Sequence, residues 1–437
     1  MGSKRLQRND PALCEAVLQK VELEASQFIP IYKEIHQHPE LPSFEVATAS
    51  TIANHLERLS FQIHSSIGGH GLVGVLLNGE GPSVLLRAEL DALPVEERTG
   101  LDYASTKRML DENGEEQPVM HACGHDLHMA AVLGAAASLV AIKQFWSGRL
   151  IVLFQPNEEY VAGAKLMVED GLWTRISPPD LMLAQHAGKL KSGFVGISGG
   201  AVLPASHNIH LRLSSSGPAQ NPQICGDLVS KACALTLQLR EKVKSAKGAN
   251  QYATLICRRF HSESMFVHPP NSVDMAFELR TANNAVAVEL LDLIKRVVVE
   301  ECESTTSPKL TVTSRVEIRA PMTENKAEFA DPLAMTFKYH FRERFYSPAM
   351  DPAVEDFALL GPDIPYLYWR FGATDQARWD EAESLGEVDE KIPGPHSPFF
   401  APEIEISLKS GIEAMVLGFL TFTSIRDDVR LISHNDR

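Results

Sequence analysis

The first 60 residues carry apolar side chains at the spacing of an α-helix. Between residues 11 and 38 apolar positions recur at roughly helical intervals, which predicts one long or broken helix with one face against a core. The segment 36–42 reads His-Gln-His-Pro-Glu-Leu-Pro and ends that helix, because proline cannot continue it. A second helix is predicted over residues 44–59.

Compact apolar runs then alternate with further helical patterns. The runs are short, typical of strands buried on both faces, and cover residues 71–77, 83–88, 149–155 and 181–186. Helices are predicted between them over residues 126–142 and 162–169. This alternation predicts an α/β fold in which a central mixed sheet is flanked by helices.

The pattern changes between residues 206 and 319. Strands and helices are predicted in the order strand, helix, strand, strand, helix, strand, over residues 209–213, 226–244, 252–260, 273–280, 285–302 and 309–318. This β-α-β-β-α-β order is that of a ferredoxin-like domain, so an inserted domain is expected at residues 206–319. Residues 1–205 and 320–437, where the α/β pattern resumes, are expected to form the larger domain.

Composition narrows the class of protein. With 437 residues the chain is long enough for two domains, and its formal charge of −15 argues against nucleic acid as a partner, because nucleic-acid binding needs Lys and Arg. The six cysteines are scattered without a disulfide framework, which indicates a reducing, cytoplasmic environment. The longest nearly apolar run, residues 129–142, is too short to span a bilayer, so no membrane partner is expected.

The densest group of chemically active side chains lies at residues 118–129. Within eight residues this segment places three histidines, one cysteine and one aspartate. Thiolate and neutral imidazole are strong ligands for zinc-like cations, and the glycine between Cys123 and His125 lets the backbone turn so that both reach one point. Asp126 is close enough to orient an imidazole ligand. The alternative is a buried cysteine beside polar residues that cap an apolar helix.

Further acids and histidines follow predicted strands. Glu158 and Glu159 come after the strand at residues 149–155, at the end where α/β sheets place ligands, so one carboxylate can hold a metal while its neighbour takes a proton. His186 ends another strand, and His396 lies between prolines. Taken alone, each of these residues is more often a solvated or structural side chain than a ligand, so they indicate a metal site only together.

Two more acids, Glu89 and Asp91, follow the strand at residues 83–88 in the segment Glu-Leu-Asp-Ala-Leu-Pro. Such acids can bind a metal, orient a ligating imidazole or cap the next segment. We expect them to support the ligands.

In this order the motifs resemble those of the metallopeptidase-like amidohydrolases, of the hippurate hydrolase, indole-acetyl-amino-acid hydrolase and N-acyl-amino-acid amidohydrolase type. The resemblance rests on the motifs at residues 87–94, 120–128, 154–159, 186 and 396–398. It extends over nearly the whole chain, because residues 36–41 and the inserted domain also match. It implies a catalytic domain and an inserted lid domain, the latter of the kind through which family members dimerise.

The resemblance also implies roles for individual residues. It implies two divalent metal ions, zinc or manganese, with the thiolate between them, on Cys123, His125, Glu159, His186 and His396. Glu158 would be the general base for a metal-activated water, and the three acids Glu89, Asp91 and Asp126 would support the ligands. The implied reaction is hydrolysis of the amide bond of a small N-acyl or N-aroyl amino acid by a homodimer.

The inserted domain departs from the family pattern. Pro218 stands where the family carries a histidine that stabilises the oxyanion, and residues 266–270 differ from the family's Asn-Val-Ile-Pro. Candidates to replace that histidine, or otherwise to contact substrate, are His207, His261, His268 and Arg280.

Three functions are open at this point. The first is amide hydrolysis at a two-metal site. The second is acyl transfer or amide-bond formation by the same site in a specialised biosynthetic pathway, because a lid without the usual histidine could exclude water. The third is binding without catalysis, against which the adjacent Glu158 and Glu159 argue, because a binding protein needs no general base.

Overall fold

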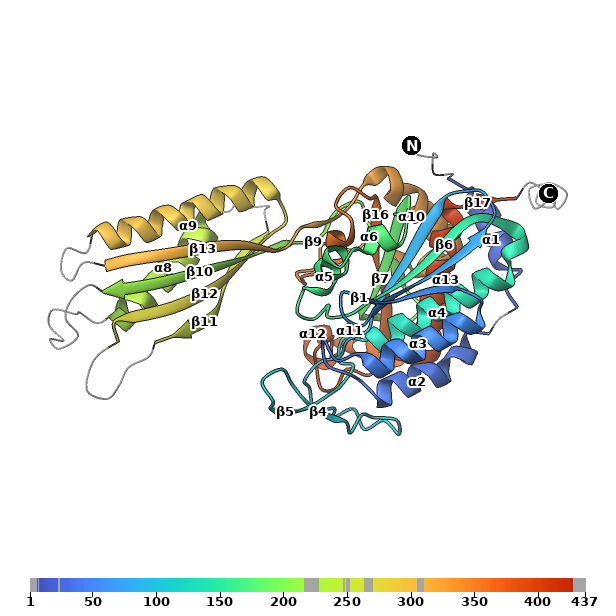
Figure 1. Ribbon diagram of the computed structural model, residues 1–437, viewed down its shortest axis with the longest axis horizontal. Helices are drawn as coiled ribbons and strands as arrows, with labels where there is room; N and C mark the ends of the chain where they lie inside the picture. Colours follow the sequence, from blue (N-terminus) through green and yellow to red (C-terminus); the bar gives the residue numbers. More distant parts are fainter. Residues whose placement is uncertain are drawn as a thin grey trace. The chain divides into compact units, whose positions relative to one another are not determined.

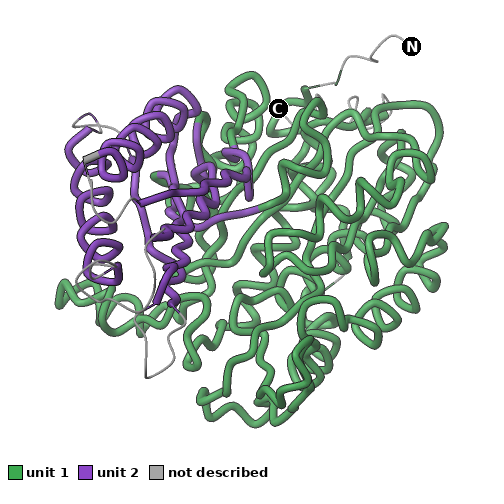
Figure 2. Tube along the Cα trace, turned by 60° about the vertical axis from the view of Figure 1, so that its left-hand side comes forward, with its two compact units in different colours: residues 1–200, 324–349, 356–437 green, residues 201–323, 350–355 purple. Residues whose placement is uncertain are grey.

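The computed structural model describes residues 6, 8–22, 24–215, 228–246, 248, 252–262, 270–304 and 310–426. Two compact units divide the chain (Figure 2). Unit 1 comprises Met1–Gly200, Glu324–Ala349 and Asp356–Arg437, and unit 2 comprises Ala201–Thr323 and Met350–Glu355. In the last of these segments the N–H of Asp351 bonds to the carbonyl of Val202, also in unit 2, at 3.0 Å.

A nine-stranded mixed sheet forms the centre of unit 1 (Figure 1). Its order is β1 (Gln62–Ile67), β2 (Gly71–Asn78), β6 (Trp146–Gln155), β3 (Ser83–Glu89), β7 (Leu181–Lys191), β16 (Tyr366–Thr374), β8 (Val195–Gly196) and β15 (Phe345–Tyr346), with β17 (Ser424–Ile425) paired to β6. β3 is parallel to β6 and β7, whereas β2 is antiparallel to β1 and β6. The predicted mixed sheet is thereby confirmed.

Unit 1 also contains helices, several of which contact strands of this sheet. The helices are α1 (Pro11–Leu18), α2 (Ile29–Gln37), α3 (Val46–Arg58), α4 (His125–Ala141), α5 (Gly163–Glu169), α6 (Leu172–Arg175), α10 (Ala327–Phe341), α11 (Gln376–Leu385), α12 (Val388–Lys391) and α13 (Ile404–Phe422). Short 3₁₀ turns are η1 (Ala25–Phe28), η2 (Lys143–Phe145), η3 (Arg342–Arg344) and η4 (Phe357–Leu360), and a hairpin is formed by β4 (Arg108–Leu110) and β5 (Glu116–Pro118). None of the helices that the structure describes is long and apolar enough to cross a membrane.

The predicted N-terminal helix is broken in two. Asp10 caps the start of α1, whose last turn closes at Gln19, and a separate helix, α2, starts beside Pro30 after an irregular stretch. Proline is favoured in the first turn of a helix, so its position marks the new start.

Two of these helices, α4 and α13, are buried almost all round and pack against each other. Small residues allow the close approach: a side chain added at Gly134 of α4 would overlap Ile412 of α13, and one added at Gly411 would press on Ala131. Because α4 begins directly after Cys123 and Gly124, this core fixes the start of the histidine-rich motif.

Unit 2 contains a four-stranded antiparallel sheet. Its order is β11 (Ala253–His261), β12 (Ser272–Thr281), β10 (Ala205–Ser215) and β13 (Leu310–Ala320). Apolar side chains of these strands form a core with α8 (Leu228–Ala246) and α9 (Asn284–Ser304). Along the chain this is the predicted β-α-β-β-α-β order. The chain passes from one unit to the other within β9 (Gly200–Leu203) and within β14 (Thr323–Asn325), and again at each end of the segment Met350–Glu355.

Candidate metal centre

Adjacent parallel strands bring the predicted site residues to one region of unit 1. β3 ends at Glu89, its neighbour β6 ends at Gln155, and β7, on the other side of β3, contains His186. Because parallel strands end at the same edge of a sheet, the loops after β3 and β6 lie together. The Glu158–Glu159 pair is in the loop after β6.

The five predicted ligands form two groups that share Cys123. The ligand atoms of Cys123, His125 and His186 lie within 4.8 Å of one another, and so do those of Cys123, Glu159 and His396. The Sγ of Cys123 is 3.4 Å from Nε2 of His186, and Oε2 of Glu159 is 3.4 Å from Nε2 of His396. A thiolate common to both groups suits a pair of cations with nitrogen, sulfur and oxygen ligands.

Backbone carbonyls set the tautomers of two of these histidines. Nδ1 of His125 lies 2.8 Å from the carbonyl oxygen of Asp91, and Nδ1 of His186 lies 2.6 Å from that of Ala187. Since a carbonyl oxygen only accepts, Nδ1 carries the proton in each neutral ring. The lone pair of each Nε2 is then available to a metal.

Unpaired atoms in this region fit a cation. Among the residues that the structure describes, the buried atoms without a hydrogen-bond partner include Nε2 of His125, Oε1 of Glu159 and Oδ1 of Asp91. Burying polar atoms without partners is costly. These atoms can each offer a lone pair, which a divalent cation would bind.

The electrostatics of these side chains also favour a bound cation. Although burial by itself lowers the pKa of His125, a hydrogen bond to Asp91 and the charge of Glu89 raise that pKa to about 10. Burial raises the pKa of Glu159 to about 7, and burial together with the Glu159 and Glu158 charges raises the pKa of the Cys123 thiol well above its usual value. The protein alone therefore holds an excess of carboxylate charge here, which a divalent cation would neutralise while favouring the thiolate.

A distant loop brings His396 to this place. Its N–H donates to the carbonyl of Ala122, at 2.7 Å, which ties the loop to the turn before α4. The backbone of His396 (φ +70°) and that of Gly124 (φ +84°) are both left-handed. This conformation is easy for glycine but strained for histidine, so the surroundings must hold it. The side chain of His396 is 57% exposed, whereas the other four ligand side chains are buried.

Of the three supporting acids, Asp91 touches two ligands directly. Its carbonyl orients His125, as described, and its Oδ2 accepts the N–H of Glu159, at 2.9 Å. Glu89 lies 2.7 Å from Nδ1 of His128, and it also pairs with the buried Arg87. A carboxylate oxygen of Glu89 also lies within 4.8 Å of a ring nitrogen of His125, so Glu89 borders the ligand group.

Asp126 binds a histidine outside the ligand set. Its Oδ2 lies 2.6 Å from Nδ1 of His36, whose Nε2 lies 3.1 Å from Oε1 of Glu97. Burial alone would lower the pKa of His36, but hydrogen bonds to the two carboxylates raise it to about 9. Sequence reasoning assigned no role to His36 or His128; the only local signals were the segment 36–42 and the position of His128 one helical turn after His125.

The lid candidates lie in unit 2. His207 is in β10, 8% exposed, and its Nδ1 has no partner among the described residues; burial lowers its pKa. Arg280 in β12 bonds to the buried Glu278 and to the carbonyl of Pro352. Pro218 and His268 lie outside the described residues, and His261 ends β11.

Comparison with known proteins identifies the family. The model of the family described as "Peptidase family M20/M25/M40" matches residues 85–392. The chain belongs to this family, which confirms the resemblance found in its motifs. It is an enzyme, a metal-dependent hydrolase of amide bonds.

The relatives include two curated hydrolases and a solved structure. N-acetyl-L-cysteine deacetylase of Bacillus subtilis is 30% identical over 356 residues, which are 81% of this chain and 82% of the relative. Hippurate hydrolase of Campylobacter jejuni is 30% identical over 324 residues, 73% of this chain and 80% of the relative. A dinuclear metal-binding M20 peptidase from Bacillus subtilis shares the fold, with a TM-score of 0.73 and 21% identity, covering 91% of this chain and 98% of that one.

Proposed function

We propose that the chain is a dinuclear metal-dependent amidohydrolase. The residues that would hold two divalent cations, zinc or manganese, are Cys123, His125, Glu159, His186 and His396. The observation that carries the proposal is the pair of ligand groups that share Cys123, beside the buried carboxylate of Glu158. Thiolate and imidazole ligands favour zinc, and carboxylate ligands also suit manganese.

Glu158 is proposed as the general base. When bound, a pair of divalent cations polarises an amide carbonyl and lowers the pKa of water. Oε2 of Glu158 lies 3.6 Å from Nε2 of His125, so its carboxylate borders the ligand group. It takes the proton of the attacking water and passes it to the leaving nitrogen. Only 7% of Glu158 is exposed, which shields that proton from bulk solvent.

The substrate class proposed is a small N-acyl or N-aroyl amino acid. Its support is the names of the relatives, which include an N-acetyl-L-cysteine deacetylase and a hippurate hydrolase, each 30% identical to this chain. These substrates share an amide bond between a short acyl group and an amino acid, and the products are a carboxylic acid and an amino acid.

A direct test combines metal analysis with turnover. Wild-type protein and Glu158→Gln, which removes the base but keeps the shape, are incubated with a panel of N-acyl and N-aroyl amino acids. We expect two metals per chain in both proteins, product release by the wild type, and at least a 100-fold loss in the variant. Equal turnover by both proteins would refute the role of Glu158, and wild-type protein without bound metal would refute the site.

The second candidate function is acyl transfer or amide-bond formation at the same site. The observation in its favour is Pro218, which replaces the histidine that the family uses to stabilise the oxyanion. Incubation with an acyl donor and excess amine separates the two functions. A new amide product in preference to the free acid would support transfer, and free acid alone would support hydrolysis.

We also propose that the protein is a homodimer. The proposal rests on the resemblance to family members that dimerise through the lid domain. Sedimentation equilibrium is expected to give twice the mass of the 437-residue chain. A mass of one chain would contradict the proposal.

A further inference from the structure

A buried carboxylate outside the ligand set bonds to the loop that carries Glu158 and Glu159. Glu45, which directly precedes α3, has no exposed surface. Its Oε1 accepts hydrogen bonds from the N–H of Ser43, at 3.0 Å, and from the N–H of Asn157, at 2.8 Å. One carboxylate oxygen thus joins the segment before α3 to the residue directly before Glu158.

This carboxylate does not cap α3. The side chain of Glu45 accepts no hydrogen bond from the first turn of that helix, whereas the side chain of Glu40 accepts from the N–H groups of Ala47 and Thr48. Glu40 therefore caps the helix, whereas Glu45 binds the loop that carries Glu158 and Glu159.

The position of Glu45 is costly for stability. Burial, and secondly the charge of Asp91, raise the pKa of Glu45 to about 7. Its Oε2 has no partner among the described residues, and neither has Oδ1 of Asn157. A buried carboxylate without a cationic partner is unfavourable, so the contribution of Glu45 has to lie in what it holds.

The residue that it holds has a left-handed backbone. Asn157 has a φ of +58°, a conformation that is uncommon outside glycine and that asparagine adopts more readily than most residues. The carbonyl of Asn157 accepts the N–H of Gly163, at 3.1 Å, and a side chain added at Gly163 would overlap the carbonyl of Pro156. The loop of residues 156–163 is therefore a tight turn whose shape depends on the conformation of Asn157.

A second carboxylate holds the other end of the acidic pair. The N–H of Glu159 donates to Oδ2 of Asp91, at 2.9 Å. The backbone of Glu158 and Glu159 thus lies between two acceptors, Glu45 on one side and Asp91 on the other. Movement of the Asn157 N–H would rotate the peptide units on which both acidic side chains are mounted.

We propose that Glu45 is a positioning residue, whose hydrogen bond to the N–H of Asn157 fixes the turn that aims Glu158 and Glu159 into the metal centre. This inference rests on the proposed function, which makes Glu158 the base and Glu159 a ligand. A displacement of about 1 Å in a catalytic group can cost on the order of 100-fold in rate, so a residue that touches no reacting atom can still control turnover.

The test uses two substitutions and a matched control. Glu45→Met keeps the length of the side chain and removes the acceptor and the buried charge, whereas Glu45→Gln keeps an oxygen that can accept the same two hydrogen bonds. Glu40→Gln is the control, because it alters a buried carboxylate in the same segment that has no bond to residues 157–159. Metal content, kcat, KM and hydrogen–deuterium exchange of peptides covering residues 155–163 are measured for each.

In Glu45→Met we expect kcat to fall on the order of 100-fold with KM within about threefold, metal content to fall below two per chain, and exchange at residues 155–163 to accelerate. In Glu45→Gln we expect kcat, metal content and the exchange rate of residues 155–163 each to stay within about threefold of the wild-type value, because the acceptor is present. Glu40→Gln is expected to leave the exchange of residues 155–163 and the metal content unchanged.

Folded Glu45→Met with wild-type exchange and metal content would overturn the proposal, as would accelerated exchange in Glu45→Gln. If Glu45→Met does not fold, Glu45→Gln still shows whether the turn depends on the accepting oxygen of residue 45 or on its charge, because this variant keeps the oxygen and removes the charge. Exchange and metal content are read without substrate, so they decide the role of Glu45 even if the wild-type protein hydrolyses no amide and the proposed function fails.

Discussion

The backbone N–H of Ala187 donates a hydrogen bond to Nε2 of His128, with the two nitrogens 2.8 Å apart. On the other side of the ring, Nδ1 lies 2.7 Å from Oε2 of the buried Glu89. Burial lowers the pKa of His128, which favours the neutral ring, and because Nε2 accepts, Nδ1 must carry the proton. His128 thus ties Glu89 to the backbone directly after His186, a proposed ligand.

Replacing His128 is expected to weaken the metal centre without removing a ligand. In His128→Ala the N–H of Ala187 and the carboxylate of Glu89 each lose a partner, so the free energy of unfolding should fall by about 1–3 kcal/mol. Metal affinity should fall by about 10–100-fold, the usual effect of losing a residue that orients a ligand. Competition with a chromogenic chelator measures that affinity.

Ser138→Ala provides the matched control. Ser138 is buried in the same helix, α4, and among the described residues its hydroxyl bonds only to the carbonyl of Gly134, within the helix. This variant should lose about 1 kcal/mol of stability or less and bind metal as the wild type does. Equal loss of metal affinity in both variants would show that α4 as a whole, and not His128, holds the ligand in place.

Substitution of the shared ligand should affect both metals. Cys123 belongs to both ligand groups, whereas His186 and His396 belong to one each. Cys123→Ala is therefore expected to lose both metals, and His396→Ala to keep more than half of its metal, as measured by mass spectrometry of the dialysed proteins. Two metals in Cys123→Ala would contradict a bridging role for the thiolate.

Removal of metal should lower stability. A ligand that binds only the folded protein stabilises it by about 2.7 kcal/mol when its free concentration is about 100 times the dissociation constant. Treatment with a chelator should therefore lower the unfolding temperature of the wild type, and added zinc or manganese should restore it. In Cys123→Ala the chelator should have little effect, and an equal shift in both proteins would place the responsible metal elsewhere.

Local sequence patterns were enough for some elements and not for others. β3 and β6 were predicted because their apolar runs are short and compact. The helix α13 was not predicted individually, because most of its surface is buried and its buried positions mix serines and glycines with apolar residues, so only a narrow polar stripe marks it. The expectation for residues 320–437 was only a general α/β pattern.

Local sequence likewise marks some residues of the metal centre and not others. Cys123 and His125 are marked by their own spacing around a glycine, whereas His396 comes to the centre through a bond to the carbonyl of Ala122, which is distant in sequence. The backbone strain at His396 has no local sequence signal either. Local sequence therefore made His396 no more than a candidate, and its role as a ligand came from the resemblance to the family. The bond from Ala187 to His128 depends on the packing of β7 against α4 and was not foreseen.

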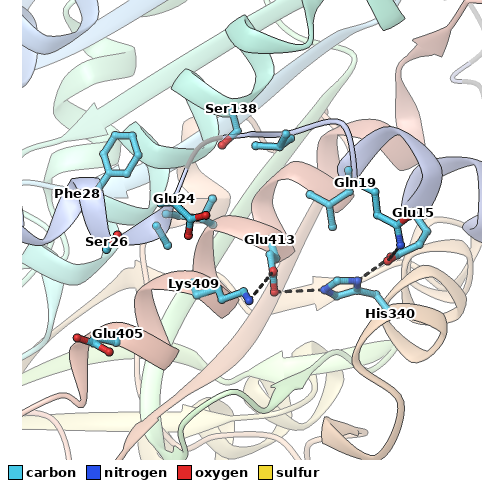
Figure 3. A pocket seen from close by; sticks show the side chains of 14 residues that line it. Glu15, Gln19, Glu24, Ser26, Phe28, Ser138, His340, Glu405, Lys409 and Glu413 are labelled. Carbon is cyan, nitrogen blue, oxygen red and sulfur yellow. Dashed lines mark hydrogen bonds and ion pairs between the residues drawn. The ribbon is translucent and has the colours of Figure 1, made fainter.

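His340 links three helices of unit 1 and should make stability depend on pH. Its Nδ1 lies 2.6 Å from Oε2 of Glu15 in α1, and its Nε2 lies 3.2 Å from Oε2 of Glu413 in α13 (Figure 3). Burial by itself lowers the pKa of His340, but the hydrogen bonds to the two carboxylates raise it to about 9. The ring is therefore charged in the folded protein at neutral pH.

The ordinary pKa of histidine, about 6.5, applies to the unfolded chain. Below that pH both states are protonated and the stabilisation by His340 is fully present; it declines above pH 6.5 and is lost as the pH rises through about 9. Its size is about 2–3 kcal/mol, because the side chain is only 13% exposed. Urea unfolding of the wild type at about pH 6 and about pH 10 measures the change.

His340→Gln isolates this contribution from other groups. The comparison is needed because the pKa of His36 is also raised to about 9, so the wild type as a whole loses stability over the same range. The difference in unfolding free energy between wild type and His340→Gln should be about 2–3 kcal/mol at pH 6 and near zero at pH 10. A difference that is the same at both values would mean that His340 acts through packing and neutral hydrogen bonds, and that its charge contributes nothing to holding α1, α10 and α13 together.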